Sequence, residues 1–100
     1  MRRNNSLALS VKFIGSFRSL SGKSMLELKL EGSSPIGDIV KMIVAELPKL
    51  EPALVDPESE RPRTNMLVLV NGKEISVLDR FETMIKNGDE LVFVPIVHGG

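Results

Sequence analysis

Apolar and polar residues alternate in two runs near the start of the chain. In residues 7–14, LALSVKFI, every second side chain is a large apolar one, which is the period of a β-strand. Residues 24–32, SMLELKLEG, place leucines on one face and Glu or Lys on the other. The segment between them, GSFRSLSGK, is rich in Gly and Ser and therefore predicts a turn. We expect the two strands to form a hairpin.

The period then changes to that of a helix. Apolar residues recur every three or four positions and predict an amphipathic helix that buries one stripe: Ile36, Ile39, Val40, Ile43 and Leu47. Ser34 is expected to be the N-cap and Pro35 the first helical residue. Pro48 should end the helix, because proline cannot continue it. This is the main helix that the pattern predicts.

Residues 48–64 contain four of the six prolines and many charges. Leu50, Ala53 and Leu54 are expected in a short helical turn that packs on the core. The remainder, DPESERPRT at residues 56–64, predicts an exposed and mobile loop.

The last third of the chain returns to strands. Residues 66–75, MLVLVNGKEI, surround Asn71-Gly72, the dipeptide best suited to a tight hairpin turn. Residues 76–85 predict a short helical turn from which Leu78 and Met84 or Ile85 enter the core. After a turn at KNGDEL, the strand ELVFVPIV is apolar on both faces, so we expect it to be central in its sheet and to pair in parallel with the first strand.

This order of elements predicts an α+β fold, with one main helix packed across a mixed sheet of four to five strands. A length of 100 residues with 42% apolar side chains suits one core. We therefore expect a single domain over residues 1–100, with a mobile loop near 56–64 and a flexible tail at 97–100.

Composition excludes several classes of function. Thirteen basic residues balance thirteen acidic ones, so the excess of positive charge typical of nucleic-acid binders is missing. With no Cys and one His, the usual ligands for a metal site are too few, and we expect none. No run approaches the ~20 apolar residues that span a bilayer. We expect a cytoplasmic monomer that binds neither membranes nor nucleic acid.

The chemistry that remains lies at the chain end, VHGG. The α-carboxylate of Gly100 is ionised at neutral pH, with an ordinary pKa of ~3.3–3.7, and it acylates nothing until it is activated. Glycine at the last two positions leaves no side chain to obstruct a narrow enzyme channel. The alternative is that these residues are an unstructured end without function.

Three motifs together resemble those of a known family: VKFIGSFRSLSG at the start, VLVNGKEI in the middle and NGDELVFVPIVHGG at the end. The chain resembles the β-grasp sulfur carriers and ubiquitin-like modifiers. This family includes the small subunit of molybdopterin synthase, the thiamine sulfur carrier, the ubiquitin-related modifier of tRNA thiolation and archaeal small modifier proteins. The resemblance covers the whole chain except the DPESERPRT loop, and it implies the β-grasp fold.

The resemblance implies that the protein is a carrier and not an enzyme. A partner related to the ubiquitin-activating enzyme would use ATP to adenylate Gly100, and no cofactor would be bound. The product would become a thiocarboxylate or be joined to lysines of target proteins. The acceptor partners would then be the large subunit of molybdopterin synthase, a tRNA-thiolation enzyme or those lysines. The ending VHGG favours the tRNA branch and FVPIV the molybdopterin branch, so both stay open.

The resemblance also implies roles for individual residues. Gly100 would carry the reactive carboxylate, and Gly99, His98, Val97 and Ile96 would be recognised as the threaded tail. Apolar residues of the sheet would dock the partner, although the same residues could instead serve as core: Leu67, Leu69, Val92 and Val94. The alternative function is a β-grasp interaction module that is never activated.

Overall fold

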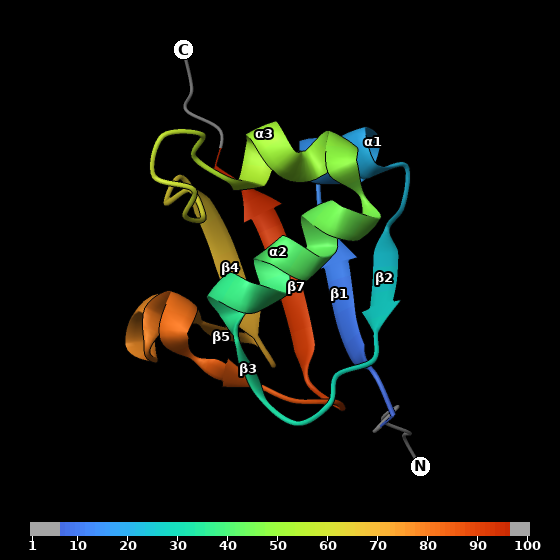
Figure 1. Cartoon of the computed structure of the whole chain (residues 1–100), viewed down its shortest axis with the longest axis vertical. Helices are drawn as coiled ribbons and strands as arrows, with labels where there is room; N and C mark the ends of the chain where they lie inside the picture. Colours follow the sequence, from blue (N-terminus) through green and yellow to red (C-terminus); the bar gives the residue numbers. More distant parts are fainter. Residues whose placement is uncertain (1–6, 97–100) are drawn as a thin grey trace.

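The computed structural model describes residues 7–96, which form a five-stranded sheet with helices on one face (Figure 1). The sheet contains β1 (Leu9–Phe13), β2 (Met25–Leu28), β4 (Met66–Val70), β5 (Lys73–Glu74) and β7 (Glu90–Pro95). The strand order is β2-β1-β7-β4-β5. A second, two-stranded sheet pairs β3 (Ser34–Pro35) with β6 (Met84–Ile85).

The last strand is central, as the sequence predicts. β7 runs parallel to β1 and antiparallel to β4, so both of its edges are paired. The opening strands β1 and β2 are antiparallel, and β4 meets β5 through Asn71-Gly72. Both turn residues have positive φ, 50° at Asn71 and 87° at Gly72, which is the geometry that this dipeptide favours.

The main helix α2 (Ile36–Glu46) crosses the sheet and closes the core (Figure 1). Four residues of its predicted stripe are buried: Ile36, Ile39, Val40 and Ile43. They pack with strand residues and with Leu50 and Leu54. These two leucines lie in the 3-10 turn η1 (Pro48–Leu50) and in the short helix α3 (Glu51–Leu54), which confirms the predicted helical turn. No helix within residues 7–96 has the length and apolar character needed to cross a membrane.

Three local predictions are wrong. The segment predicted as a turn forms a short helix, α1 (Ser16–Ser21), because Phe17 is buried in the core and a helical turn carries it there. The N-cap of α2 is Pro35 instead of Ser34, since both residues pair with β6 as a short strand. Of the predicted core residues in 76–85, only Ile85 is buried.

The segment around Leu78 forms two 3-10 turns, η2 (Ile75–Val77) and η3 (Arg80–Glu82). These turns bury Ile75 and partly bury Phe81. Leu78 and Met84 are exposed instead. A short apolar run in irregular backbone has no fixed period, so the pattern could not tell which side chains point inward.

The predicted loop at residues 56–64 is exposed over most of its length and is crossed by hydrogen bonds. An isolated β-bridge joins Val55 to Pro62. The mobility of this loop stays a prediction. The predicted tail, residues 97–100, lies outside the described residues.

Candidate functional site

The strand that leads to the chain end is anchored on the core side of the sheet. Leu91 and Phe93 of β7 are fully buried, and the rings of Phe93 and Phe13 lie 6.3 Å apart between centroids. These two rings face each other across the parallel β1–β7 pair. A buried aromatic pair of this kind is stabilising beyond its buried area. The residues before the tail are therefore fixed in position.

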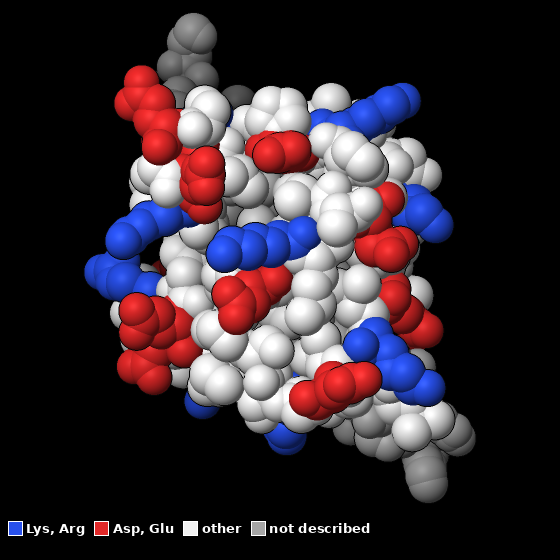
Figure 2. All heavy atoms as spheres, in the orientation of Figure 1, with Lys and Arg blue, Asp and Glu red and all other residues white. Residues whose placement is uncertain are grey.

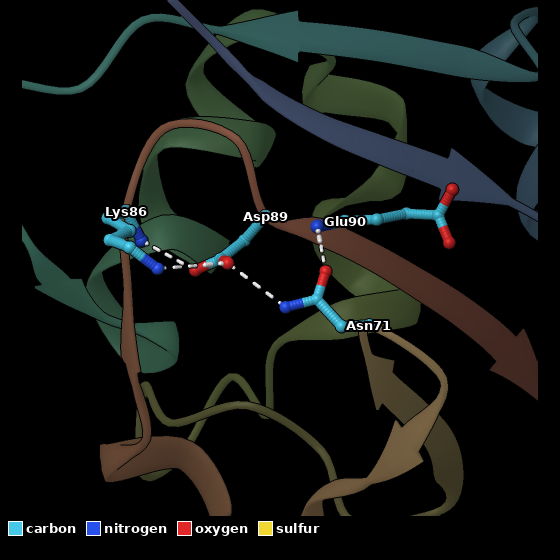
Figure 3. A network of polar contacts seen from close by, with 4 residues as sticks. All are labelled: Asn71, Lys86, Asp89 and Glu90. Carbon is cyan, nitrogen blue, oxygen red and sulfur yellow. Dashed lines mark hydrogen bonds and ion pairs between the residues drawn. The ribbon is translucent and has the colours of Figure 1, made fainter. Parts of the chain in front are cut away.

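The start of β7 is held by a polar network between two turns (Figure 3). Asn71, in the β4–β5 turn, donates from Nδ2 to Asp89 Oδ1 at 3.0 Å and accepts the backbone N–H of Glu90 at Oδ1, at 2.9 Å. Asp89 also accepts the backbone N–H of Lys86 at 2.9 Å. Two motifs far apart in the sequence, VNG and NGDE, thus lock one corner of the fold.

Asp89 is the one charged residue that is buried within residues 7–96. Burial by itself raises the pKa of its carboxyl, but the hydrogen bond from Asn71 and the backbone bond and charge of Lys86 favour the ionised form. These interactions outweigh burial, so the pKa of Asp89 lies below its ordinary value. The role of this carboxylate is structural, because all its partners belong to the two turns.

The four residues predicted to dock a partner lie together on the sheet face opposite α2. Leu67 pairs with Val94 and Leu69 pairs with Val92 across β4 and β7. All four are half-buried, whereas their neighbours along each strand point into the core. We call these four residues the open-face patch. The structure excludes the alternative that they form the core, and their contact with a partner stays a prediction.

Charged and apolar side chains flank the open-face patch. Lys12 lies beside Val92 on β1 and forms an ion pair with Glu90, with Nζ 3.0 Å from Oε2. Glu74 lies beside Leu69 on β5. Met25, beside Lys12 on β2, is exposed. The patch therefore has an apolar centre and a mixed rim, as protein interfaces do.

At the end of β7 the chain leaves the sheet beside Gly15. Gly15 has φ 61° and ψ −133°, a conformation that side chains strongly disfavour. A Cβ on this residue would lie 3.3 Å from Pro95 Cγ. Ile96, the last described residue of the predicted tail, is 45% exposed. Gly15 thus allows the backbone to lie close to Pro95 where the tail departs.

Sequence reasoning missed Gly15 as a neighbour of the chain end. The contact joins residues 80 positions apart, so no local pattern reveals it. Its only signal was a glycine directly after a strand. The other predicted tail residues, Val97, His98, Gly99 and Gly100, lie outside the described residues.

No group of three or more His, Cys, Asp or Glu side chains between residues 7 and 96 is placed to hold a metal ion. The last residues of β7, Val94 and Pro95, and Ile96 after them have apolar side chains. The prediction that the reactive group lies in the main chain beyond Ile96 concerns residues outside the described ones and stays a prediction.

Comparison with known proteins points to one family. The model of the ThiS family matches residues 11–100. Small archaeal modifier protein 3 of Haloferax volcanii is 29% identical over 94 residues, which cover 94% of this chain and all of that protein. Ubiquitin-related modifier 1 of Schizosaccharomyces pombe is also 29% identical, over 99 residues, with 94% of this chain and all of that protein covered.

The solution structure of small archaeal modifier protein 1 from Methanosarcina acetivorans has the same fold. It superposes with a TM-score of 0.81 at 26% identity and covers 93% of this chain and 96% of that one. The predicted α+β, β-grasp architecture is thus confirmed by both the strand order and this likeness.

Proposed function

This chain belongs to the ThiS family of ubiquitin-like sulfur carriers and modifiers, and we propose that its reactive group is the α-carboxylate of Gly100. The relatives support a carrier or modifier and not the alternative of an interaction module that is never activated. The family match extends to residue 100. The supporting structural observation is the central position of β7, which carries the chain end out of a rigid core.

The first step we propose is adenylation by a partner of the ubiquitin-activating type. The carboxylate oxygen of Gly100 attacks the α-phosphorus of ATP, and pyrophosphate leaves with the electron pair of the broken P–O bond. The product is a mixed anhydride of the carboxyl group and AMP. The reaction needs ATP, which is consistent with a cytoplasmic protein.

The second step exchanges AMP for another nucleophile. A hydrosulfide that adds to the carbonyl carbon displaces AMP, and loss of the S–H proton leaves a thiocarboxylate. The amine of a lysine on a target protein would also displace AMP, with loss of one proton, and leave an isopeptide. The thiocarboxylate would supply sulfur to a molybdopterin synthase or to a tRNA-thiolation enzyme.

The geometry of the described residues suits these steps. Four residues follow Ile96, and when fully extended they reach at most about 14 Å. Such a tail can enter a channel while the folded body stays outside. We propose that the open-face patch, which contains Val94 one residue before the end of β7, docks on the activating enzyme.

Intact-mass spectrometry of the full chain purified from its native host tests the proposal. We expect a population whose mass corresponds to one oxygen replaced by sulfur, or lysine-linked adducts that carry the terminal glycines. A variant that lacks Gly99 and Gly100 is the control and should show neither. If the full chain shows neither species under conditions where sulfur transfer is active, the proposal is wrong.

A further inference from the structure

The segment outside the family motifs builds a hollow on the helical side of the molecule. The hollow has a volume of about 540 Å³ and lies between α2 and residues 51–63, in the size range of ligand sites. Six of the residues that line it are valines or prolines: Val40, Val44, Pro52, Val55, Pro57 and Pro62. Figure 1 shows α2 and α3 on the same side of the sheet, whereas the open-face patch lies on β4 and β7 on the opposite face.

Hydrogen bonds hold the wall of the hollow in shape. The backbone N–H of Asp56 donates to Arg61 O at 2.9 Å, and that of Arg63 donates to Leu54 O at 2.8 Å. Arg63 Nε donates to Pro52 O at 2.9 Å. Proline also restricts the backbone of the unfolded chain, so less entropy is lost on ordering this segment. The hollow is therefore preformed, which lowers the cost of binding.

The rim of the hollow has more acidic than basic residues, although the net charge of the whole chain is zero. Its charged residues are the acids Glu51, Asp56 and Glu60 and the bases Lys41 and Arg63. Within residues 7–96, none of these five takes part in an ion pair. Glu51 and Glu60 are exposed, so their carboxylates are available to a ligand. Figure 2 shows this side of the molecule, where charged side chains surround uncharged surface.

The chemistry of the hollow selects one class of ligand. The lining contains no aromatic side chain, so a nucleobase would have no ring to stack on. The rim has three acids against two bases, and this balance favours a cationic ligand over a phosphate or a carboxylate. An aliphatic side chain fits between the prolines, and a neighbouring cation fits the rim.

We propose that the hollow binds a short peptide segment of a partner protein in which an aliphatic residue is flanked by lysine or arginine. The aliphatic side chain contacts Val44 and Val55, and the flanking cations pair with Glu51 and Glu60. Because the hollow and the open-face patch lie on opposite sides, both can be occupied at once. This binding needs no activation of Gly100 and is independent of the proposed function.

NMR titration of the ¹⁵N-labelled full chain tests the inference, with three capped pentapeptides as probes. The first has leucine between two lysines, the second has leucine between two glutamates, and the third has glycine between two lysines. We expect saturable shifts of the Val40, Val44 and Val55 amides with the first peptide only. Equal binding of the second or third peptide, no saturable shift, or shifts confined to the open-face patch would overturn the inference.

Charge variants sharpen the test, since between residues 7 and 96 no ion pair involves any of the substituted side chains. Glu51→Gln and Glu60→Gln should each weaken binding of the lysine–leucine peptide by roughly twofold to fivefold. Lys41→Gln should strengthen it, because it removes a repulsive charge. Glu31→Gln, an exposed acid outside the hollow, is the matched control and should change nothing. Unchanged affinity in both glutamate variants would contradict the proposed pairing.

A second copy of the chain is the competing occupant. Met1, Arg2 and Arg3 have the same chemistry as the proposed ligand. If the amides that line the hollow shift with protein concentration in the absence of peptide, and deletion of residues 1–6 removes this dependence, the hollow serves self-association and the inference is overturned. If the chemical shifts of these amides do not change with protein concentration, the result supports a separate partner protein.

Discussion

At its start, β7 is fixed by directional polar contacts: Asp89 and Asn71 join two turns, and the carboxylate is buried among its donors. At its end, the same strand is held by apolar contacts and by the close approach of Gly15 to Pro95, and Ile96 is exposed. One end of the strand is thus tied to the fold and the other is left accessible.

This difference between the two ends of β7 suggests that residues at its start serve stability, whereas the residues beyond its end serve the proposed reaction. Hydrogen bonds to a buried charge contribute to stability only while the geometry is kept, so the start of β7 tolerates little change. The end of β7 leads to the tail, where the proposed reactive group is the main-chain carboxylate. Substitutions at the start should therefore change folding, whereas changes beyond Ile96 should change reactivity alone.

Deletion of Gly99 and Gly100 gives the largest expected effect. Formation of the acyl-adenylate by the activating enzyme should be lost completely, because the shortened chain ends two residues earlier and its carboxylate belongs to His98, which has a bulky side chain. The free energy of unfolding should stay within about 0.5 kcal/mol of the parent value, as for other changes away from packed features. Intact-mass analysis and urea denaturation measure the two quantities. A loss of stability would show that the tail belongs to the fold.

Phe93→Ala, in the middle of β7, should have the largest effect on folding. Phe93 is fully buried and faces Phe13, so its truncation should cost about 3–5 kcal/mol. Val92→Ala, on the same strand but facing the open side, is the matched control and should cost far less. Similar costs for the two variants would contradict the assignment of the two sheet faces.

Asp89→Asn tests the polar start of β7. The new amide would direct a donor at the N–H groups of Asn71 or Lys86, and one buried hydrogen bond to a charge would be lost. We expect a loss of about 1.5–3 kcal/mol in the free energy of unfolding. Adenylation of the folded variant at saturating enzyme should be unchanged, since the tail is remote from this corner. A loss of adenylation without a loss of stability would contradict the idea that the start of β7 affects folding and only its end affects reactivity.

Gly15→Ala tests the close contact between Gly15 and Pro95 at the end of β7. The conformation at φ 61° and ψ −133° should cost about 1–3 kcal/mol with any side chain, and the new Cβ would press on Pro95. Gly32→Ala is a useful control, because Gly32 also has positive φ but has open space around it. If only the Gly15 variant also slows adenylation, the contact with Pro95 directs the tail.

The pH dependence of stability gives the smallest effect. The pKa of Asp89 is lower in the folded state than its ordinary value of 3.8. The ionised carboxylate therefore stabilises the fold above that value, and this contribution is lost as the pH falls through the lower folded-state pKa. The difference in unfolding free energy between the parent and Asp89→Asn should decrease in that acidic range. A difference that grows on acidification would contradict the sign of the shift.

Much of the fold followed from local patterns. Alternation located β1 and β2, apolar runs next to turn signals located β4 and β7, the helical period located α2, and Asn71-Gly72 located the hairpin turn. The predictions failed where tertiary contacts override local signals. Phe17 draws a Gly/Ser-rich segment into a helix, and pairing with β6 draws Ser34 out of its expected capping position.

The candidate site divides in the same way. Family motifs and the terminal glycines led to the proposed reactive group, and the family resemblance supplied the four residues of the open-face patch. Which face of the sheet those residues occupy was left open, because a strand that is apolar on both sides gives no preference. The packing of α2 on the opposite face decides it.

The sequence by itself determined the order and type of the main elements and the main-chain group proposed to react, because hydrophobic period, turn chemistry and terminal glycines are local properties. Only the tertiary structure decided that Gly15 lies against Pro95, that Asp89 and Asn71 lock one corner, and that residues 51–63 enclose a hollow with α2. Each of these joins residues distant along the chain, and such contacts depend on how the elements pack around a shared core.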